Sequence, residues 1–297
     1  MDDTLFSYKW EHPTSDNLLI KPTTPGLHRA LRGVMISVGS SGYPWLSFAP
    51  DSLQLVDSYS ADSALCLHLP QEDTRRVFFS ANLTNDWLLW AVRQQEPTVT
   101  ALSTSYKCIR LVSEVLRCYL VDVLVHAFWF GIEPNDFKVS RLQGVLDLYT
   151  RGPLSEFLYR TPRGRVRGWS PAFLQNVVWR ASDSFAQECS VADLVLYVTQ
   201  DLYMDYLCSL EGLGPSPLPE HGIFYKGIQL VPVLKKSTGS TFALLACRHS
   251  LSLLLGTGST ANLLWDPKAN LFKFTVSFDL GVSVLYPEST LLGISIP

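Results

Sequence analysis

The sequence lacks several features that would narrow its function at once. Its six cysteines are scattered without a CxxC pair, which favours reduced thiols over a disulfide framework in a chain of 297 residues. The first ten residues, MDDTLFSYKW, contain neither the basic nor the apolar region of a secretory signal. The longest apolar run, residues 118–130, spans 13 positions, whereas a membrane span needs about 20. We therefore expect a reducing compartment, cytoplasmic or nuclear, and no membrane span.

Catalytic and nucleotide-binding signatures are absent as well. The GSSG run at residues 39–42 does not have the GxSxG spacing of a nucleophile elbow. The glycine-rich stretch LGTGSTANLLWD, residues 255–266, lacks the lysine of a P-loop and lies between expected strands, so we predict a hairpin turn there. No HExxH pattern and no dinucleotide fingerprint occur. These absences favour a non-enzymatic protein and predict no cofactor.

The hydrophobic pattern predicts an α+β fold. Hydrophobic residues make up 47% of the chain, which is enough to build a core. We predict β-rich segments at residues 1–82 and 223–297, a central bundle of about five helices at residues 83–212, and a proline-rich linker at residues 213–222. The two β-rich ends form either one composite domain with the helices or separate sheets.

Individual strands and helices follow from periodicity and capping residues. Alternation predicts strands at residues 33–39 (GVMISVG), 64–69 (ALCLHL), 75–80 (RRVFFS), 228–234, 241–247 and 271–278. Capping signals predict helices at residues 85–95 after Thr84, 103–130 before Gly131, and 141–150 after Ser140. Two further helices are expected from Pro171, preceded by Ser170, and from Ser190 to about residue 212.

An arginine-rich loop is the most distinctive local feature. Residues 160–169, RTPRGRVRGW, contain Arg160, Arg163, Arg165 and Arg167 beside Trp169. Residues 138–180 carry eight basic side chains and two acids, whereas residues 181–220 carry seven acids and no lysine or arginine. Because guanidinium groups bind carboxylate and phosphate bidentately, the loop is expected to contact a partner or an anion. The alternative is neutralisation of the neighbouring acidic helix, which contains Asp193, Asp201 and Asp205, in the same chain or in another copy.

Two Cys-x-His pairs raise a metal hypothesis. Cys66 and His68 lie in the first β-rich segment, and Cys247 and His249 lie in the second. Residues i and i+2 share a face of a strand, so two neighbouring strands would bring four zinc ligands together. The spacing matches no established zinc signature. The alternative is that these four are partly buried strand residues that bind no metal.

A polar stripe runs along the long central helix. The residues Arg110, Glu114, Cys118, Asp122 and His126 recur every four positions among hydrophobic residues. An enzyme would require Asp122 and His126 to line a pocket, where the carboxylate orients the imidazole. The alternative is that these five residues have no catalytic role and form the one solvent-exposed stripe of the helix, held by ion pairs between residues i and i+4.

The sequence as a whole favours a soluble, non-enzymatic interaction, adaptor or assembly protein. Adjacent segments of opposite charge would allow one copy to dock on another, and a protein partner or self-association is expected. Against a dedicated nucleic-acid binder stands the formal net charge of −3. The alternatives are a factor that contacts nucleic acid through the arginine-rich loop, a structural or accessory subunit of a virus-like assembly, and an enzyme of unrecognised type.

Overall fold

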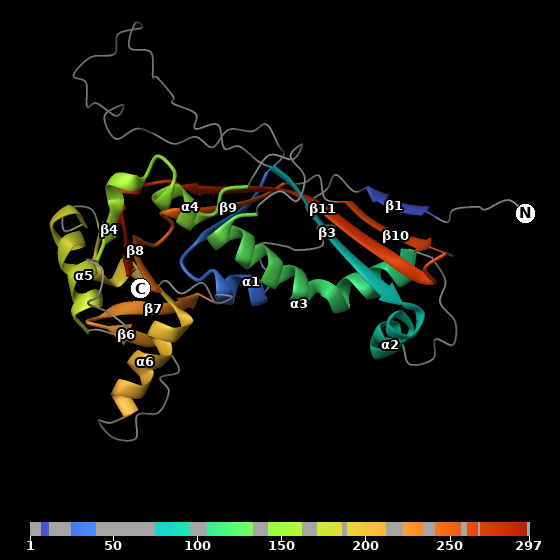
Figure 1. Ribbon diagram of the computed structural model, residues 1–297, viewed down its shortest axis with the longest axis horizontal. Helices are drawn as coiled ribbons and strands as arrows, with labels where there is room; N and C mark the ends of the chain where they lie inside the picture. The colour runs from blue at the N-terminus through green and yellow to red at the C-terminus, as the bar shows by residue number, and fades with distance from the viewer. Residues whose placement is uncertain are drawn as a thin grey trace, which may run out of the picture.

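The computed structural model describes eleven stretches of the chain. They are residues 7–11, 25–39, 75–95, 106–132, 142–161, 171–185, 189–211, 222–233, 241–256, 260–266 and 268–295. These stretches form two six-stranded sheets and six α-helices. Figure 1 shows one sheet together with α5 and α6 at one end of the molecule, and β1, β10 and α2 at the other.

The first sheet, sheet I, combines strands from both ends of the sequence. Its strands follow the order β1-β10-β11-β9-β2, and β3 pairs with β11. Three N-terminal strands therefore pair with three C-terminal ones, so the two β-rich ends share a sheet. The strands are β1 (Ser7–Glu11), β2 (Met35–Gly39), β3 (Arg75–Thr84), β9 (Leu251–Gly256), β10 (Thr260–Asp266) and β11 (Leu271–Val284).

The long strand β11 organises sheet I. The alternation predicted at residues 271–278 is confirmed for Lys273, which is exposed, and for Phe274 and Val276, which are buried, whereas Ser277, expected on the polar face, is only 3% exposed. The same even-numbered face of β11 pairs with the inner face of β3, where Val77 and Leu83 are buried. In the turn from β10 to β11, Asp266 Oδ1 accepts hydrogen bonds from the backbone N–H groups of residues 268 and 269.

The second sheet, sheet II, lies entirely in the second half of the chain. Its order is β4-β12-β8-β5-β7-β6. The pairings of β4 with β12 and of β5 with β7 are parallel, and the other three are antiparallel. The strands are β4 (Leu158–Arg160), β5 (Leu194–Thr199), β6 (Ile223–Tyr225), β7 (Ile228–Val233), β8 (Thr241–Cys247) and β12 (Thr290–Ser295).

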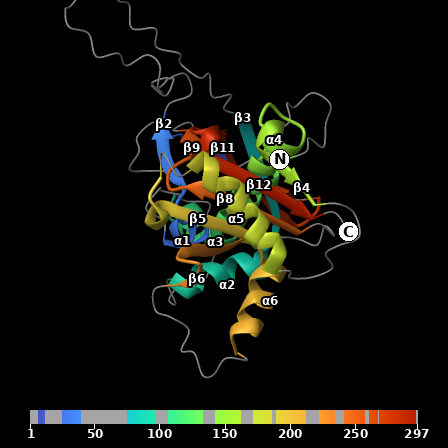
Figure 2. The same cartoon turned by 90° about the vertical axis from the view of Figure 1, so that its left-hand side faces the viewer.

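The helices cover the sheets from different sides. Helices α5 and α6 pack on one face of sheet II (Figure 2), whereas α3 contacts α1, α2 and α4. The helices are α1 (Pro25–Ala30), α2 (Asn85–Gln95), α3 (Tyr106–Phe130), α4 (Val145–Thr150), α5 (Pro171–Phe185) and α6 (Gln200–Glu211). Thr84 caps α2 as predicted, since its Oγ1 accepts from the backbone N–H of Trp87 at 3.2 Å. Gly131 follows α3 with φ +73°, which also confirms the prediction.

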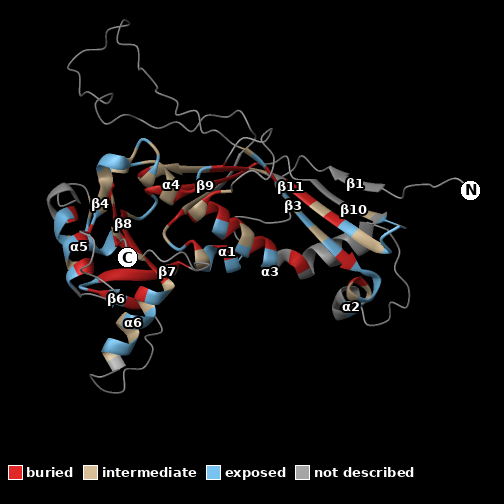
Figure 3. Cartoon of the chain, viewed as in Figure 1, coloured by how far each residue is buried: buried red, intermediate tan, exposed pale blue. Residues whose placement is uncertain are grey.

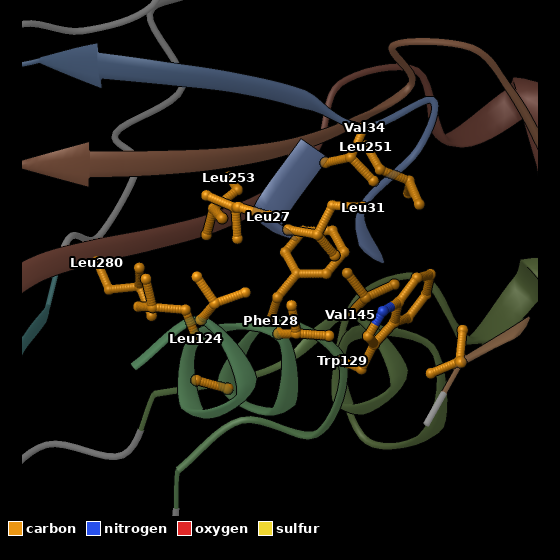
Figure 4. Packing of buried hydrophobic residues seen from close by; sticks show 14 of the residues in the cluster. Leu27, Leu31, Val34, Leu124, Phe128, Trp129, Val145, Leu251, Leu253 and Leu280 are labelled. Atoms are coloured by element: carbon orange, nitrogen blue, oxygen red, sulfur yellow. The ribbon is translucent and has the colours of Figure 1, made fainter. Parts of the chain in front are cut away.

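Two hydrophobic clusters hold this arrangement together. The larger one joins sheet I, α1 and α3 to one face of sheet II; Figure 4 shows Phe128 and Trp129 of α3 packed near Leu27 and Leu31. The Trp129 ring lies 5.0 Å from that of Tyr197 in β5, measured between centroids. The smaller cluster fills the space between the other face of sheet II and helices α5 and α6. Sheet II is thus covered on both faces, which is visible as buried strands in Figure 3.

The predicted fold class, a central five-helix bundle between two β-rich segments, is wrong. Strands β4 and β5 lie within the predicted helical core. Of the helices in that region, α2 and α4 contact α3, whereas α5 and α6 pack on sheet II, so the five do not form one bundle. The main error falls on the helix predicted from Ser190. Ser190 Oγ does accept from the backbone N–H of Ala192 at 3.3 Å, but it caps only a 3₁₀ turn at Val191–Asp193. The next six residues form β5, a central strand of sheet II.

The physical reason is the burial of β5 on both faces. All six residues, LVLYVT, are buried, so the strand shows no alternation between apolar and polar positions. A short, continuous apolar run cannot be distinguished from part of a buried helix by periodicity alone. The helix itself, α6, begins at Gln200 and ends at Glu211.

Three smaller corrections concern element limits and pairing. Helix α4 spans only Val145–Thr150 and is capped by Gly144 rather than Ser140, which lies outside the described residues. Strands β9 and β10 do not form the predicted hairpin, because both pair with β11 instead of with each other. Three predicted features lie outside the described stretches: the strand at residues 64–69, the cap Ser170, and all but the last residue of the linker at 213–222.

Candidate assembly surfaces

The root of the arginine-rich loop lies at one edge of sheet II. Arg160 is the last residue of β4 and is exposed. The following residue, Thr161, donates from its backbone N–H and from its Oγ1 to the carbonyl of Ile294, at 3.1 and 3.2 Å. These bonds fix where the chain leaves the sheet. Arg163, Arg165, Arg167 and Trp169 lie outside the described residues, so their roles stay predictions.

A second arginine lies beside this root. The guanidinium of Arg180, in α5, stacks 4.3 Å from the ring centre of Tyr159 in β4. Cations held over an aromatic face gain about 0.5–1 kcal/mol at exposed sites. Tyr159 faces α5, whereas the next residue, Arg160, belongs to the opposite face of sheet II, where its partner Ile294 packs. The same edge of sheet II therefore carries one arginine on each face.

The acidic segment lies on a different part of sheet II. Asp193 precedes β5, and Asp201 and Asp205 are exposed on α6. Helix α6 packs on β5 and β7, whereas β4 is separated from β5 by β12 and β8. Among the described residues Arg160 forms no ion pair with these acids. At Arg160, neutralisation within one chain is therefore not observed.

Large apolar side chains are exposed on both halves of the molecule. Those on the half that contains sheet I are Phe78, Trp90 and Tyr119; those near sheet II are Trp179, Val191, Met204, Phe224 and Tyr286. Phe78 and Trp179 are the most exposed, at 65% and 66%. Single exposed apolar residues are ordinary on protein surfaces, but aromatic residues are enriched at interfaces.

Phe78 lies in a setting suited to docking. It is on the outer face of β3, opposite Ser277 of β11, and the next outward-facing pair is the ion pair of Arg76 with Asp279 at 3.4 Å. Within the described strands, β3 pairs only with β11, which leaves its other edge unpaired. Sequence reasoning overlooked a signal here, since the adjacent Phe78 and Phe79 cannot both face the core of one strand.

The structure contradicts the metal hypothesis for the pair Cys247 and His249. Cys247 is the last residue of β8, but His249 is an exposed turn residue with φ +66°. The two side chains therefore do not share a strand face, which was the basis of the hypothesis. Cys66 and His68 lie outside the described residues. In the part of the chain that the structure describes, no group of three His, Cys, Asp or Glu residues is placed to hold a metal ion.

The polar stripe of α3 faces solvent where it is described. Asp122 and His126 are both exposed, and the His126 ring packs against Phe130 with centroids 4.9 Å apart. The idea that Asp122 and His126 line a pocket is therefore wrong. The side chains of Arg110, Glu114 and Cys118 are not among those described. No described helix is long and apolar enough to span a membrane.

Comparison with known proteins shows a likeness in fold. No protein-family model matches the sequence, and no curated protein matches it. The structure is similar to a chain of the satellite phage P4 procapsid that includes the size determination (Sid) protein, with 15% identity and a TM-score of 0.55 over 75% of this chain and 71% of that chain. At this identity the likeness shows a shared fold.

Two further structures align over more of the chain at lower TM-scores. One is the holo-SrpI encapsulin complex from Synechococcus elongatus PCC 7942, with 13% identity and a TM-score of 0.49 over 92% of this chain and 88% of that chain. The other is a virus-like particle from Pyrococcus furiosus, with 12% identity and a TM-score of 0.48 over 90% and 94%. The likeness in fold rests on the procapsid chain, the one of these three structures with a TM-score above 0.5.

Proposed function

We propose that this protein is a non-enzymatic structural subunit that assembles with copies of itself into a closed shell. The observation that carries the proposal is the fold shared with a chain of the satellite phage P4 procapsid. A fold alone does not fix a function, so the proposal also depends on the surfaces that the chain presents.

Those surfaces suit repeated association. A subunit of a ring or shell joins its neighbours through heterologous contacts, in which two different surfaces of each copy meet. The chain offers such pairs: an outer face of sheet I with Phe78, and a basic edge of sheet II with Arg160 and Arg180. The elongated arrangement in Figure 1 separates these two surfaces along the molecule, which allows each to contact a different neighbour.

Charge complementarity supports a specific contact between copies. The arginine-rich loop begins at the β4 edge, and the exposed Asp201 and Asp205 lie on α6 over a different part of sheet II. In this contact, the loop of one copy binds α6 of the next through charge-assisted hydrogen bonds. The alternative occupant of the loop is a nucleic-acid backbone, for which the guanidinium groups are equally suited. Either role fits the reducing cytoplasmic or nuclear compartment expected from the cysteines.

The test is the size of the purified, reduced full-length protein. We expect light scattering after gel filtration to give a mass of many copies, and negative-stain microscopy to show closed particles of uniform diameter. A monomer at every protein concentration and ionic strength tested would refute the proposal. Absorbance at 260 nm in excess of protein would identify bound nucleic acid and favour the alternative occupant of the loop.

A further inference from the structure

The turn that follows α1 is held firmly against sheet II. The Tyr197 hydroxyl, in β5, donates a hydrogen bond of 2.8 Å to the backbone carbonyl of Arg32. The backbone N–H of His249 donates one of 2.8 Å to the carbonyl of Gly33. Both bonds bridge segments far apart in sequence, and Tyr197 is fully buried. The position of Arg32 relative to the β8–β9 turn, which contains Arg248, is therefore fixed by the fold.

Gln229 lies between these two arginines. It is only 4% exposed, at the start of β7, and its Oε1 accepts from Nη2 of Arg248 at 3.4 Å. Because arginine only donates hydrogen bonds, this contact assigns the oxygen of the amide to the side of Arg248. The amide nitrogen then faces the other way and has no hydrogen-bond partner among the described residues.

That nitrogen and Arg32 converge on one point beside Gly222. A Cβ placed on Gly222 would lie 3.0 Å from Gln229 Nε2 and 3.6 Å from Arg32 Nη1. Gly222 has φ +100°, a backbone conformation that L side chains rarely adopt, so residue 222 itself places no side chain beside the two nitrogens. The exposed ring of Phe224 lies on the same face of the sheet, since Phe224 pairs with Gln229.

The cluster contains hydrogen-bond donors without a matching anion. Arg32 and Arg248 are both exposed, and neither forms an ion pair with a described residue. The Arg32 guanidinium and the Gln229 amide N–H lie beside Gly222, and the Arg248 guanidinium lies at the oxygen end of the same amide. Together these groups form a donor set that an oxyanion satisfies. We infer that Arg32, Gln229 and Arg248 form a binding site for an oxyanion, either a phosphate group or a carboxylate.

All donors of this site come from one chain, so the binding of free phosphate does not require assembly. Its ligand has two sources that share the same chemistry. One is free phosphate. The other is the carboxylate of an aspartate or glutamate from a second copy, which becomes available only if the protein assembles. The experiment therefore has one arm for each source.

The first arm measures phosphate binding to the full-length protein. We expect sodium phosphate to raise the melting temperature above that in sodium chloride of equal ionic strength, with saturation, and ³¹P NMR to show line broadening. Arg248→Gln and Arg32→Gln should weaken the apparent affinity about tenfold or more, the loss expected for one charge-assisted hydrogen bond. Lys273→Gln, which removes an exposed charge from sheet I, is the matched control and should leave affinity unchanged.

Arg248→Lys distinguishes a specific site from general attraction to positive charge. It keeps the charge but loses the planar fork, so affinity should fall in this variant too. Equal affinity of wild type and all four variants would overturn the site. Melting temperatures in chloride alone check that each variant folds.

The second arm applies if phosphate does not bind to the wild type. Sedimentation velocity would then compare assembly of the Arg248→Gln and Lys273→Gln variants. A loss of assembly in Arg248→Gln alone would identify the carboxylate of a second copy as the ligand. No phosphate binding together with unchanged assembly in both variants would overturn the proposal. If the protein binds phosphate but stays monomeric, the result would support the oxyanion site and contradict the proposal that the protein assembles into a shell.

Discussion

The Tyr197 hydroxyl donates a 2.8 Å hydrogen bond to the carbonyl of Arg32, which lies 165 positions earlier in the sequence. This bond joins the N-terminal α1 region to the central strand of sheet II. Tyr197→Phe removes the donor and leaves the carbonyl without its partner, so the free energy of unfolding should fall by about 1 kcal/mol. Denaturant titration measures the change. Tyr286→Phe, at an exposed position, is the control and should change it little.

Gly33 makes the same junction sensitive to a single methyl group. It has φ +84°, and a Cβ there would lie 2.8 Å from Tyr197 Oη and 3.0 Å from Val195 Cγ2. Gly227 has the same φ of +84°, but its nearest contact would be 3.7 Å away. Gly227→Ala therefore measures the backbone cost alone, about 1–2 kcal/mol. We expect Gly33→Ala to be clearly more destabilising, and equal losses in the two variants would show that the clash relaxes freely.

Buried tyrosines should make the fold sensitive to alkaline pH. Burial raises the pKa of Tyr149 and Tyr197 far above the ordinary value, and it outweighs the opposing effects of the Thr290 hydrogen bond and of the Arg248 charge. Below pH about 10, both the folded and unfolded chains keep these protons. Above it, the unfolded chain releases them while the folded chain holds them, so stability is lost as the pH rises.

Urea titrations between pH 7 and 11.5 measure this loss. We expect a steady midpoint up to about pH 9 and a decline above about pH 10. Tyr149→Phe removes one of the two groups, together with its 2.6 Å hydrogen bond to Thr290. The variant should therefore be less stable at neutral pH but have a shallower decline in alkali. Parallel declines in wild type and variant would assign the effect to other groups, such as lysines.

The parts of the fold that sequence analysis predicted correctly are those with one solvent-facing side. Strand β11 alternates because its outer face is polar, and Thr84 and Gly131 mark helix ends through local chemistry. Strand β5 was not predicted, because both of its faces are covered and its six residues therefore show no alternation between apolar and polar positions. Local pattern does not record what packs on a segment from elsewhere in the chain.

The same limit explains which site residues were missed. Arg32, Gln229 and Arg248 are distant in sequence, and no local pattern connects them; only the pairing of β5 with β7 and β8 brings the last two together. The arginine-rich loop was noticeable because its charges are contiguous. The Cys-x-His pairs were noticeable for the same reason, yet β8 ends at Cys247, so His249 lies in the following turn and not on the same strand. Residues that are close in sequence are thus easily recognised as a motif, but their side chains need not lie together in the fold.

Exposed Phe78 gives a direct test of the outer face of sheet I. Because its side chain is 65% exposed, Phe78→Ser should change the free energy of unfolding by no more than about 0.5 kcal/mol. If this face is a contact between copies, the variant should assemble only at a higher protein concentration. Phe79→Ser alters the neighbouring residue, which packs against the core, and should instead lower stability. Light scattering and denaturation together separate the two effects, and normal assembly of Phe78→Ser would remove this face from the interface.

The arginine-rich loop can be tested through the salt dependence of assembly. If the loop binds the acidic face of α6 on a neighbouring copy, replacing Arg163, Arg165 and Arg167 by Ala should raise the protein concentration needed for assembly and flatten its dependence on salt.

The acidic half of the same contact provides the complementary variant. Asp201→Asn combined with Asp205→Asn should reproduce the defect, whereas Asp122→Asn, exposed on α3, should not. If the loop binds nucleic acid instead, the arginine variants should flatten the salt dependence of nucleic-acid binding. The aspartate variants should then leave assembly unchanged, because they remove no contact to a phosphate backbone.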